Sequence, residues 1–335
     1  MKLISYLNQN QQERLGLYIK DEGYYDMHDT AKHIKLDLPQ DMQSFLNHND
    51  TYFSKVQDLE KILYAEPEKF KPADVHTLLS PVPHPPSCRD AYAFRQHVET
   101  MRANRGADMI PEFDQFPVFY FTNHNAVFGE GPIDVYDDHL DKLDFELEIA
   151  AVIGKGGKNI PANKADEHIF GFMIMNDLSA RTLQMQELKL SLGPAKGKDF
   201  ANCFGPWLVS KDELKAFAQD TGQGLTYNLE MKATLNGELV SQGNMDSMHW
   251  TFAQIIERVS YGVNLFPGDI IGSGTVGTGC LGELNGTAAL KAKKEGKSYE
   301  PIWLKNKDQI DLEITGLGKL SNTLVHQKAS YHILK

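Results

Sequence analysis

Cysteine is scarce in this chain of 335 residues, and its spacing excludes two kinds of cysteine-based site. The three cysteines, Cys88, Cys203 and Cys280, are odd in number and far apart in the sequence. A disulfide framework needs paired cysteines, and a structural zinc site needs ligands at short, regular spacings. We therefore expect neither of them, and three free thiols suit the cytoplasm.

Long apolar runs are missing as well. No stretch approaches the roughly 18–20 apolar residues that are needed to cross a bilayer. The opening residues 1–10 lack the continuous apolar run of a signal peptide. The sequence therefore predicts a cytoplasmic protein with no membrane partner.

Positive charge is in deficit, since 34 lysines and arginines face 45 aspartates and glutamates, for a net charge of −11. No block of lysine and arginine forms a local basic patch, and a negative surface repels polyphosphate. We therefore expect no nucleic-acid partner. A small anionic substrate would need a local cluster of positive charge in its own binding site.

What is present is a pattern of many short strands with few helices. Residues 3–7 and 14–19 resemble paired strands, and residues 42–47 and 52–65 resemble helices. The proline-rich residues 79–87 favour an extended connector. We therefore predict a small β-rich N-terminal domain over residues 1–78 and a larger domain over residues 79–335.

The larger domain shows no regular alternation of strand and helix, which argues against a doubly wound parallel sheet. Apolar residues at helical spacing predict a helix over residues 90–104, with Ser87 as its cap. Capping-box patterns occur at residues 210–213 and 251–254, and Asn236-Gly237 predicts a hairpin turn. Further strands are expected at residues 118–122, 145–153, 169–175, 227–235, 270–273 and 310–315. The expected fold is α+β and β-rich, a mixed β-sandwich or roll with a few peripheral helices.

Two glutamates dominate the chemistry that the sequence suggests. On a strand, Glu146 and Glu148 share one face, while Phe145, Leu147 and Ile149 share the other, apolar face. Residues two apart on a strand are separated by roughly 6.5–7 Å, so both carboxylates can reach one hard divalent cation. A half-exposed strand with solvated glutamates is the alternative interpretation.

Three other side chains extend this group. Asp177 directly follows an apolar run, and Asp90 precedes His97; capping of a helix is the alternative role for both aspartates. If residues 90–97 are helical, Asp90 and His97 lie on the same face, roughly 10 Å apart along the axis. They could then flank a substrate, although a structural role for one of twelve histidines remains the alternative.

These motifs together resemble the fumarylacetoacetate hydrolase family over residues 90–286. The resemblance rests on several separated segments in the family's order: Asp90 with His97, Phe145-Glu146-Leu147-Glu148, Phe170-Gly171, Asn176-Asp177-Leu178-Ser179-Ala180-Arg181, Gly193-Pro194-Ala195-Lys196-Gly197-Lys198 and Gly272-Ser273-Gly274-Thr275. The fold implied is that of the family's C-terminal domain.

The resemblance also implies roles for individual residues. The metal ligands would be Asp90, Glu146, Glu148 and Asp177. His97 would be the general base with Glu283 as its partner, and Lys198 would stand near the metal. Substrate contacts would come from Tyr92, Arg181, Gln184 and Thr275. The arginine that large animal members carry after the histidine has no direct counterpart, and Arg102 and Arg105 are the candidates.

The residue chemistry agrees with this set of roles. Four carboxylates favour Mg²⁺, with Ca²⁺ or Mn²⁺ as alternatives, over metals that prefer sulfur. The expected activity is hydrolysis of a carbon–carbon bond in a β-diketo acid, with fumarylacetoacetate as the first substrate. Acylpyruvate or fumarylpyruvate hydrolysis, oxaloacetate decarboxylation and hydration are alternatives within the family, and a non-catalytic metal-binding or ligand-binding protein is the alternative outside enzymes. Family members imply a homodimer.

Overall fold

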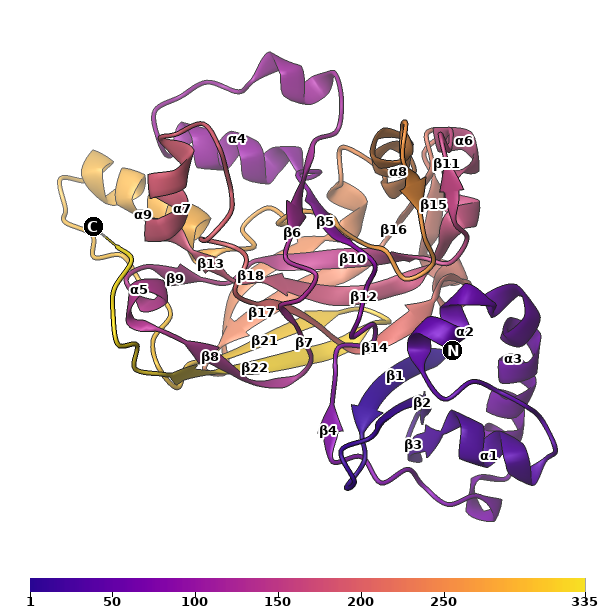
Figure 1. Cartoon of the computed structure of the whole chain (residues 1–335). Helices are drawn as coiled ribbons and strands as arrows, with labels where there is room; N and C mark the ends of the chain where they lie inside the picture. Colours follow the sequence, from indigo (N-terminus) through magenta and orange to yellow (C-terminus); the bar gives the residue numbers. More distant parts are fainter. Residues whose placement is uncertain (335) are drawn as a thin grey trace.

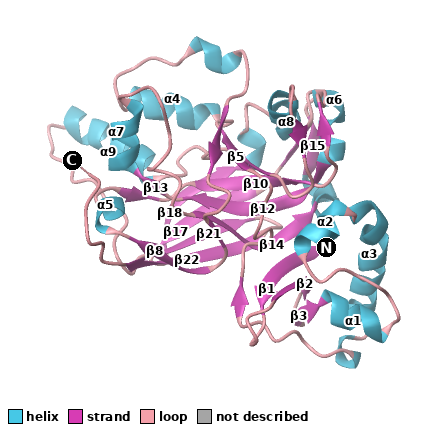
Figure 2. Ribbon diagram, in the orientation of Figure 1, coloured by secondary structure: helices cyan, strands magenta, loops and turns pink. Residues whose placement is uncertain are grey.

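Two β-sheets packed face to face form the centre of the molecule (Figure 1). The computed structural model describes residues 1–334. Figure 2 shows that the helices lie around the edges of the sheets rather than between them. This arrangement confirms the predicted α+β, β-rich sandwich with peripheral helices.

The larger sheet runs through the whole molecule and joins the beginning of the chain to its middle. Its strands are antiparallel neighbours except for two parallel pairs, β20 with β5 and β14 with β7. In spatial order they are β3 (Gly23–Asp26), β2 (Glu13–Ile19), β1 (Lys2–Leu7), β14 (Asn202–Ser210), β12 (Ile169–Asp177), β10 (Leu147–Ile153), β20 (Ile270–Gly272), β5 (Cys88–Ala91) and β6 (Phe119–Thr122), with β4 (Thr77–Leu78) beside β1 and β7 (Val127–Phe128) beside β14.

The smaller sheet covers one face of the larger one. Its strands, in order, are β18 (Glu238–Asn244), β17 (Glu230–Leu235), β21 (Gln309–Ile314), β22 (Gly318–His326) and β8 (Gly131–Val135). The predicted turn Asn236-Gly237 links β17 and β18, and both residues have positive φ, as a two-residue hairpin requires. Short strand pairs complete the β-structure: β9 (Leu143–Asp144) with β13 (Ser179–Ala180), β11 (Gly157–Lys158) with β19 (Asn264–Leu265), and β15 (Ala218–Asp220) with β16 (Leu225–Tyr227).

Alternation along β10 explains the packing between the layers. Leu147 and Ile149 belong to the core between the sheets, whereas Ala150 and Val152 face a second core that includes the N-terminal segment. Both faces of β10 are therefore buried. Phe145 lies in the first core with Leu147 and Ile149, as the period of two predicts.

The helices are short and peripheral. Within residues 1–334, no helix combines the length and the apolar character of a membrane span. Their bounds are α1 (Met27–His33), α2 (Met42–Asn47), α3 (Asn49–Ala65), α4 (Arg95–Ala103), α5 (Asp137–Leu140), α6 (Ala162–Ala165), α7 (Arg181–Leu188), α8 (Phe252–Ser260) and α9 (Leu281–Lys294). In Figure 1, α4, α7 and α9 gather at one end of the sheets, away from the N-terminal segment.

The N-terminal segment contains the predicted strand pair and both predicted helices. β1 pairs with β2, and β1 also pairs with β14 of the main sheet. The segment before residue 79 therefore continues the large sheet, with α1, α2 and α3 beside it (Figure 1). The division into domains at residues 1–78 and 79–335 stays a prediction.

The predicted helix over residues 90–104 is wrong in its first part. Residues 88–91 form β5, which is hydrogen-bonded on both sides, to β20 and to β6. Strand pairing on both sides outweighs the helical spacing of the apolar residues, so α4 begins only at Arg95. Ser87 is not its cap, because the Ser87 hydroxyl donates a hydrogen bond to Asp269 Oδ1 at 2.5 Å. Asp90 and His97 therefore do not share a helix face.

One predicted capping box is present and the other is absent. Thr251 and Gln254 form a capping box at the start of α8, as predicted. Residues 211–217 form a 3₁₀ helix whose preceding Ser210 makes no capping bond. Ser210 Oγ instead accepts a hydrogen bond from the amino group of Met1 at 3.0 Å. A contact between distant segments thus replaces the local cap.

Candidate functional site

Glu146 and Glu148 lie at the start of the central strand. β10 begins at Leu147, so Glu146 directly precedes it, and its backbone N–H donates to Asn176 Oδ1 at 3.2 Å. Both glutamates are buried. The alternative interpretation of a half-exposed strand with solvated glutamates is therefore wrong.

Two aspartates reach the same place from neighbouring strands. Asp90 lies in β5 and is separated from β10 by β20, whereas Asp177 is the last residue of β12, directly beside β10. One carboxylate oxygen each from Asp90, Glu148 and Asp177 lie within 4.8 Å of one another. We call these three residues the carboxylate cluster. Neither aspartate caps a helix, since the N-caps of α4 and α7 are Phe94 and Ala180.

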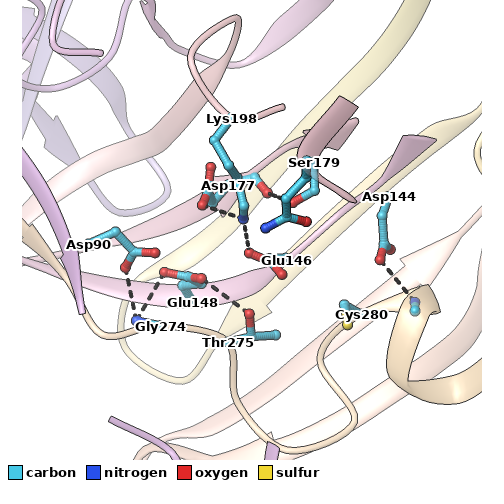
Figure 3. Close-up of polar contacts among 12 residues, drawn as sticks. Asp90, Asp144, Glu146, Glu148, Asp177, Ser179, Lys198, Gly274, Thr275 and Cys280 are labelled. Carbon is cyan, nitrogen blue, oxygen red and sulfur yellow. Dashed lines mark hydrogen bonds and ion pairs between the residues drawn. The ribbon is translucent and has the colours of Figure 1, made fainter. Parts of the chain in front are cut away.

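A tight turn after β20 supports this cluster. The backbone N–H of Gly274 donates to Asp90 Oδ1 at 3.0 Å and to Glu148 Oε2 at 3.2 Å (Figure 3). Gly274 has φ +78°, and a Cβ there would lie 2.6 Å from the carbonyl oxygen of Ala91. Thr275 Oγ1 adds a hydrogen bond to Glu148 Oε1 at 3.3 Å. The turn therefore needs glycine to hold two carboxylates in place.

Glu146 stands beside the cluster and is paired with two cations. The ammonium group of Lys198 contacts Glu146 Oε2, and it donates to Asp177 Oδ2 at 2.6 Å (Figure 3). Arg181 Nη2 donates to Glu146 Oε1 at 2.7 Å and also to Asp144 Oδ2 at 2.7 Å. The structure thus brings three of the four predicted ligands together, and Lys198 connects Glu146 to them.

His97 and Glu283 form a buried pair, although they are 186 residues apart in the sequence. His97 Nδ1 lies 2.6 Å from Glu283 Oε2. His97 comes from the first turn of α4 and Glu283 from the first turn of α9. Asn104, directly after α4, donates from Nδ2 to the carbonyl oxygen of Glu283 at 3.0 Å and so ties the two helices together. A carboxylate that holds an imidazole in this way fixes its tautomer and orientation.

A cavity of about 380 Å³ joins these groups. Tyr92, Arg181, Gln184 and Thr275, the predicted substrate contacts, all lie on its wall. The wall also includes Asp90, Glu146, Glu148, His97 and Lys198. Its size is within the range of small-molecule sites.

Burial and mutual repulsion make the carboxylate cluster electrostatically unfavourable without a cation. Burial and then the charge of Asp177 raise the pKa of Asp90 to about 7. Burial, followed by the charge of Asp90, raises the pKa of Glu148 well above its usual value. Burial would also raise the pKa of Glu146, but Lys198 and Arg181 outweigh it and lower that pKa to about 2. Without a divalent cation, Asp90 and Glu148 therefore tend to take up protons, whereas Glu146 keeps its negative charge.

The cluster fits a divalent cation. Asp177 Oδ1 is buried and has no hydrogen-bond partner among residues 1–334, which leaves a carboxylate oxygen free for a ligand. The ligand atoms that the carboxylate cluster offers are all oxygens, and Mg²⁺, Ca²⁺ and Mn²⁺ prefer oxygen ligands. These residues can therefore hold the predicted ion.

Sequence reasoning missed two side chains of this site. Tyr120 donates to Asp177 Oδ2 at 2.5 Å and lies opposite Asp90 on β6. Asp144 accepts hydrogen bonds from Arg181 and from the first backbone N–H groups of α9, at Leu281 and Gly282. Asp144 could have been found because it is two residues before Glu146 and so shares a strand face with both glutamates. Tyr120 lies between two phenylalanines in a predicted strand, and this pattern gave no sign of a functional role.

Comparisons with known proteins identify relatives of this chain. The sequence profile described as Fumarylacetoacetate (FAA) hydrolase C-terminal matches residues 87–325. Fumarylacetoacetase of Bos taurus is 39% identical over 180 residues, which are 44% of this chain and 43% of that protein. Oxaloacetate tautomerase YisK of Bacillus subtilis (strain 168) is 31% identical over 211 residues, 60% of this chain and 61% of that protein. The matches thus span less than two thirds of the length of these two relatives.

A solved structure extends the likeness to almost the whole chain. Fumarylacetoacetate hydrolase from psychrophilic Exiguobacterium antarcticum superposes with a TM-score of 0.64 and covers 98% of this chain and 100% of its own. The two sequences are 23% identical, so this likeness concerns the fold. The N-terminal segment is included in it.

Proposed function

This chain belongs to the fumarylacetoacetate hydrolase family, and from that premise we propose that it is a metal-dependent enzyme that hydrolyses a carbon–carbon bond in a β-diketo acid. Fumarylacetoacetate, which would yield fumarate and acetoacetate, is the proposed substrate. The observation that carries this proposal is the opening of one cavity onto both Asp90 and Glu148 of the carboxylate cluster and His97 of the His97–Glu283 pair.

In the proposed mechanism, Asp90, Glu148 and Asp177, joined by Glu146, would hold one Mg²⁺. Such a cation, when bound, would supply polarisation of the carbonyl group that is attacked. His97 accepts the proton of the attacking water, and Glu283 stabilises the imidazolium that forms. Lys198, already beside Glu146 and Asp177, would take a place near the developing negative charge.

Three cations on the cavity wall support an anionic substrate. They are Arg105, Arg181 and Lys198. Arg181 is held by Asp144 and Glu146, whereas the guanidinium of Arg105 forms no salt bridge within residues 1–334. Arg105 is therefore the cation best placed to bind a substrate carboxylate. It is also one of the two candidates, with Arg102, for the arginine that follows the histidine in large animal members. Arg102 Nε instead contacts the carbonyl oxygen of Asp108.

A second candidate is chemistry on oxaloacetate, either decarboxylation or tautomerisation. It is favoured by the likeness to a protein named oxaloacetate tautomerase. Hydrolysis of acylpyruvate or fumarylpyruvate remains an alternative on the same cavity. A non-catalytic ligand-binding role is less favoured, because a binding protein has no need of the buried His97–Glu283 pair.

The remaining proposals concern the surroundings of the enzyme. We propose a cytoplasmic homodimer that acts on a small anionic substrate and binds neither nucleic acid nor membranes. The net charge of −11 supports the exclusion of nucleic acid.

The test of the proposed function is a substrate panel. Protein stripped with a chelator would be mixed with fumarylacetoacetate, fumarylpyruvate, acetylpyruvate or oxaloacetate, with and without Mg²⁺ or Mn²⁺. We expect metal-dependent loss of the diketone absorbance and release of two carboxylic acids. Conversion of oxaloacetate alone would instead establish the second candidate, and no turnover of any compound would reject both.

A further inference from the structure

A third side chain with metal-binding chemistry lies beside the His97–Glu283 pair. One ligand atom each from His97, Cys280 and Glu283 lie within 4.8 Å of one another. All three residues are buried, with relative exposures of 4%, 0% and 2%. We call these residues the mixed-ligand cluster, because it offers nitrogen, sulfur and oxygen.

The fold holds this cluster in place through two helix starts. Cys280 is the N-cap of α9, and its Sγ accepts the backbone N–H of Glu283 at 3.4 Å. Glu283 in turn lies 2.6 Å from His97 Nδ1, in the first turn of α4. The three groups are therefore positioned by helix geometry and by the Asn104 bond between the helices.

The mixed-ligand cluster differs from the carboxylate cluster in the cation it suits. Oxygen-only sites favour hard cations, whereas imidazole, thiolate and carboxylate together suit Zn²⁺. A thiolate and a carboxylate carry two negative charges, which one Zn²⁺ balances. Three protein ligands leave a fourth position of the tetrahedron open, and His97 reaches the wall of the cavity.

The two clusters are also separate in space. In Figure 3, Cys280 lies on the opposite side of Glu146 from Asp90. Glu146 between them is already occupied by Lys198 and Arg181. One ion therefore cannot serve both clusters, and each can be filled independently.

We propose that His97, Cys280 and Glu283 form a second metal site, which takes a borderline divalent cation such as Zn²⁺ and thereby inhibits the enzyme. The ion takes the place of the thiol proton of Cys280, which is released, and binds His97 Nδ1, whose proton moves to Nε2. His97 then has no free ring nitrogen that can accept a proton from water. Binding releases about one proton to solvent. The inhibition rests on the proposed function, since it removes the proposed base, but the binding of the ion does not.

The test uses Co²⁺ as the probe, because a cobalt–thiolate bond has a near-ultraviolet charge-transfer band. The full-length protein would first be saturated with Mg²⁺ so that the carboxylate cluster is filled. We expect one equivalent of Co²⁺ to give the band in wild-type protein, and Zn²⁺ to abolish it by displacement. Absence of the band in wild-type protein would overturn the proposal.

Substitutions identify the thiol. Cys280→Ser should lose the band while it keeps the fold, because serine is a favoured N-cap. Cys203→Ala, which removes another buried thiol, should keep the band. If Cys280→Ser is unstable, His97→Ala, which leaves the cap intact, should weaken Co²⁺ binding by about tenfold or more. A band that persists in folded Cys280→Ser, or an unchanged affinity in His97→Ala, would show that the ion binds elsewhere.

Turnover then separates the site from the proposed function. At saturating Mg²⁺, Zn²⁺ should inhibit the wild-type enzyme, and Cys280→Ser should need about tenfold more Zn²⁺ for the same inhibition. A protein that shows the cobalt band but no turnover would keep the metal site and reject the proposed function. Equal inhibition of wild-type protein and Cys280→Ser by Zn²⁺ would show that inhibition does not arise from the mixed-ligand cluster.

Discussion

At the scale of single residues, Lys198 links two carboxylates that are expected to share one ion. Its ammonium group contacts Glu146 and Asp177, and these two charges raise the pKa of Lys198 although burial lowers it. Lys198 therefore remains a cation that partly balances the carboxylates around it. A divalent ion that also bound Glu146 would compete with Lys198 for Glu146 Oε2, whereas Asp177 Oδ1, which has no partner within residues 1–334, is free for the ion.

Substitutions of His97, Glu283 and Glu146 should separate base chemistry from metal binding. His97→Ala should lower kcat by about 10²–10⁴, the usual contribution of a general base. Glu283→Gln should give a milder loss, because it keeps the shape of the pair but removes the charge that stabilises the imidazolium. Glu146→Ala should weaken Mg²⁺ binding instead, and excess Mg²⁺ should restore only part of the activity.

These variants are to be measured by calorimetry with Mg²⁺ and by turnover with fumarylacetoacetate. Since His97 is not in the carboxylate cluster, His97→Ala serves as its own control and should bind Mg²⁺ like the wild type. Wild-type turnover of His97→Ala would contradict the water-activating role and favour a mechanism that needs the metal alone.

At the scale of elements, the ends of strands supply the carboxylates, and a turn holds two of them. Asp177 ends β12, Asp90 lies near the end of β5, and the turn after β20 binds Asp90 and Glu148 through Gly274. Regular strands keep these groups in fixed register, and the turn adds a donor that neither strand could supply. The backbone is thus part of the site.

Gly274→Ala should weaken metal binding and stability together. The new Cβ would clash with the carbonyl oxygen of Ala91, and a positive φ is strained for alanine. We therefore expect the free energy of unfolding to fall by more than about 1 kcal/mol. Displacement of the N–H that supports two carboxylates should lower Mg²⁺ affinity by about 10–100-fold. Thermal unfolding and Mg²⁺ calorimetry measure the two effects.

Gly237→Ala is the matched control for this change. Gly237 also has a positive φ, +84°, but a Cβ there meets nothing within 4 Å, and the turn lies outside the cavity wall. The Gly237→Ala variant should lose about 1 kcal/mol in its free energy of unfolding and keep the Mg²⁺ affinity of the wild type. Equal Mg²⁺ affinity in both variants would show that the Gly274 turn does not support the cluster.

At the scale of the whole molecule, one sheet connects the N-terminal segment with the site. β1 pairs with β14, which pairs with β12, which carries Asp177 at its end. The N-terminal segment holds its own buried ionic group, in which Arg14 donates to both oxygens of Asp26 at 2.8 Å and Tyr6 donates to Oδ2 at 2.7 Å. Because the sheet is continuous, we expect loss of that ionic group to lower the free energy of unfolding of the whole chain.

Asp26→Asn should make stability less dependent on acidic pH. Burial would raise the pKa of Asp26, but Arg14 and the backbone N–H of Asp29 outweigh it and lower the pKa below 3.8. A lowered pKa in the folded state contributes stability above about pH 4, and this contribution is lost as pH falls through the folded pKa. At pH 6 the free energy of unfolding of the variant should be about 1–3 kcal/mol lower than that of the wild type, and this difference should shrink toward pH 3.

Thermal unfolding between pH 3 and pH 7 measures this difference. Asp37→Asn, at an exposed position without a hydrogen bond to its carboxylate within residues 1–334, is the control and should follow the wild-type curve. A constant gap between Asp26→Asn and wild type at every pH would contradict the proposed role of the charge.

The sequence by itself determined the local features of this protein. Alternation in residues 145–149 predicts which side chains face the core, because neighbouring side chains on a strand must point to opposite faces. The Asn236-Gly237 turn and the Thr251 cap were equally local and are confirmed. The ordered motifs of the family also identified the fold, because each motif is a short segment that can be read without its neighbours.

Only the tertiary structure decided how distant segments meet. The helical spacing near Asp90 was overruled by strand pairing on both sides, because hydrogen bonds to β20 and β6 come from residues far away in the sequence. The positions of Tyr120 and Asp144 in the site depend on sheet order and on where α9 begins. Cys280 stood alone in the sequence and gave no metal signal; its contact with Glu283 is local to the start of α9, but it meets His97 only because α4 and α9 start side by side.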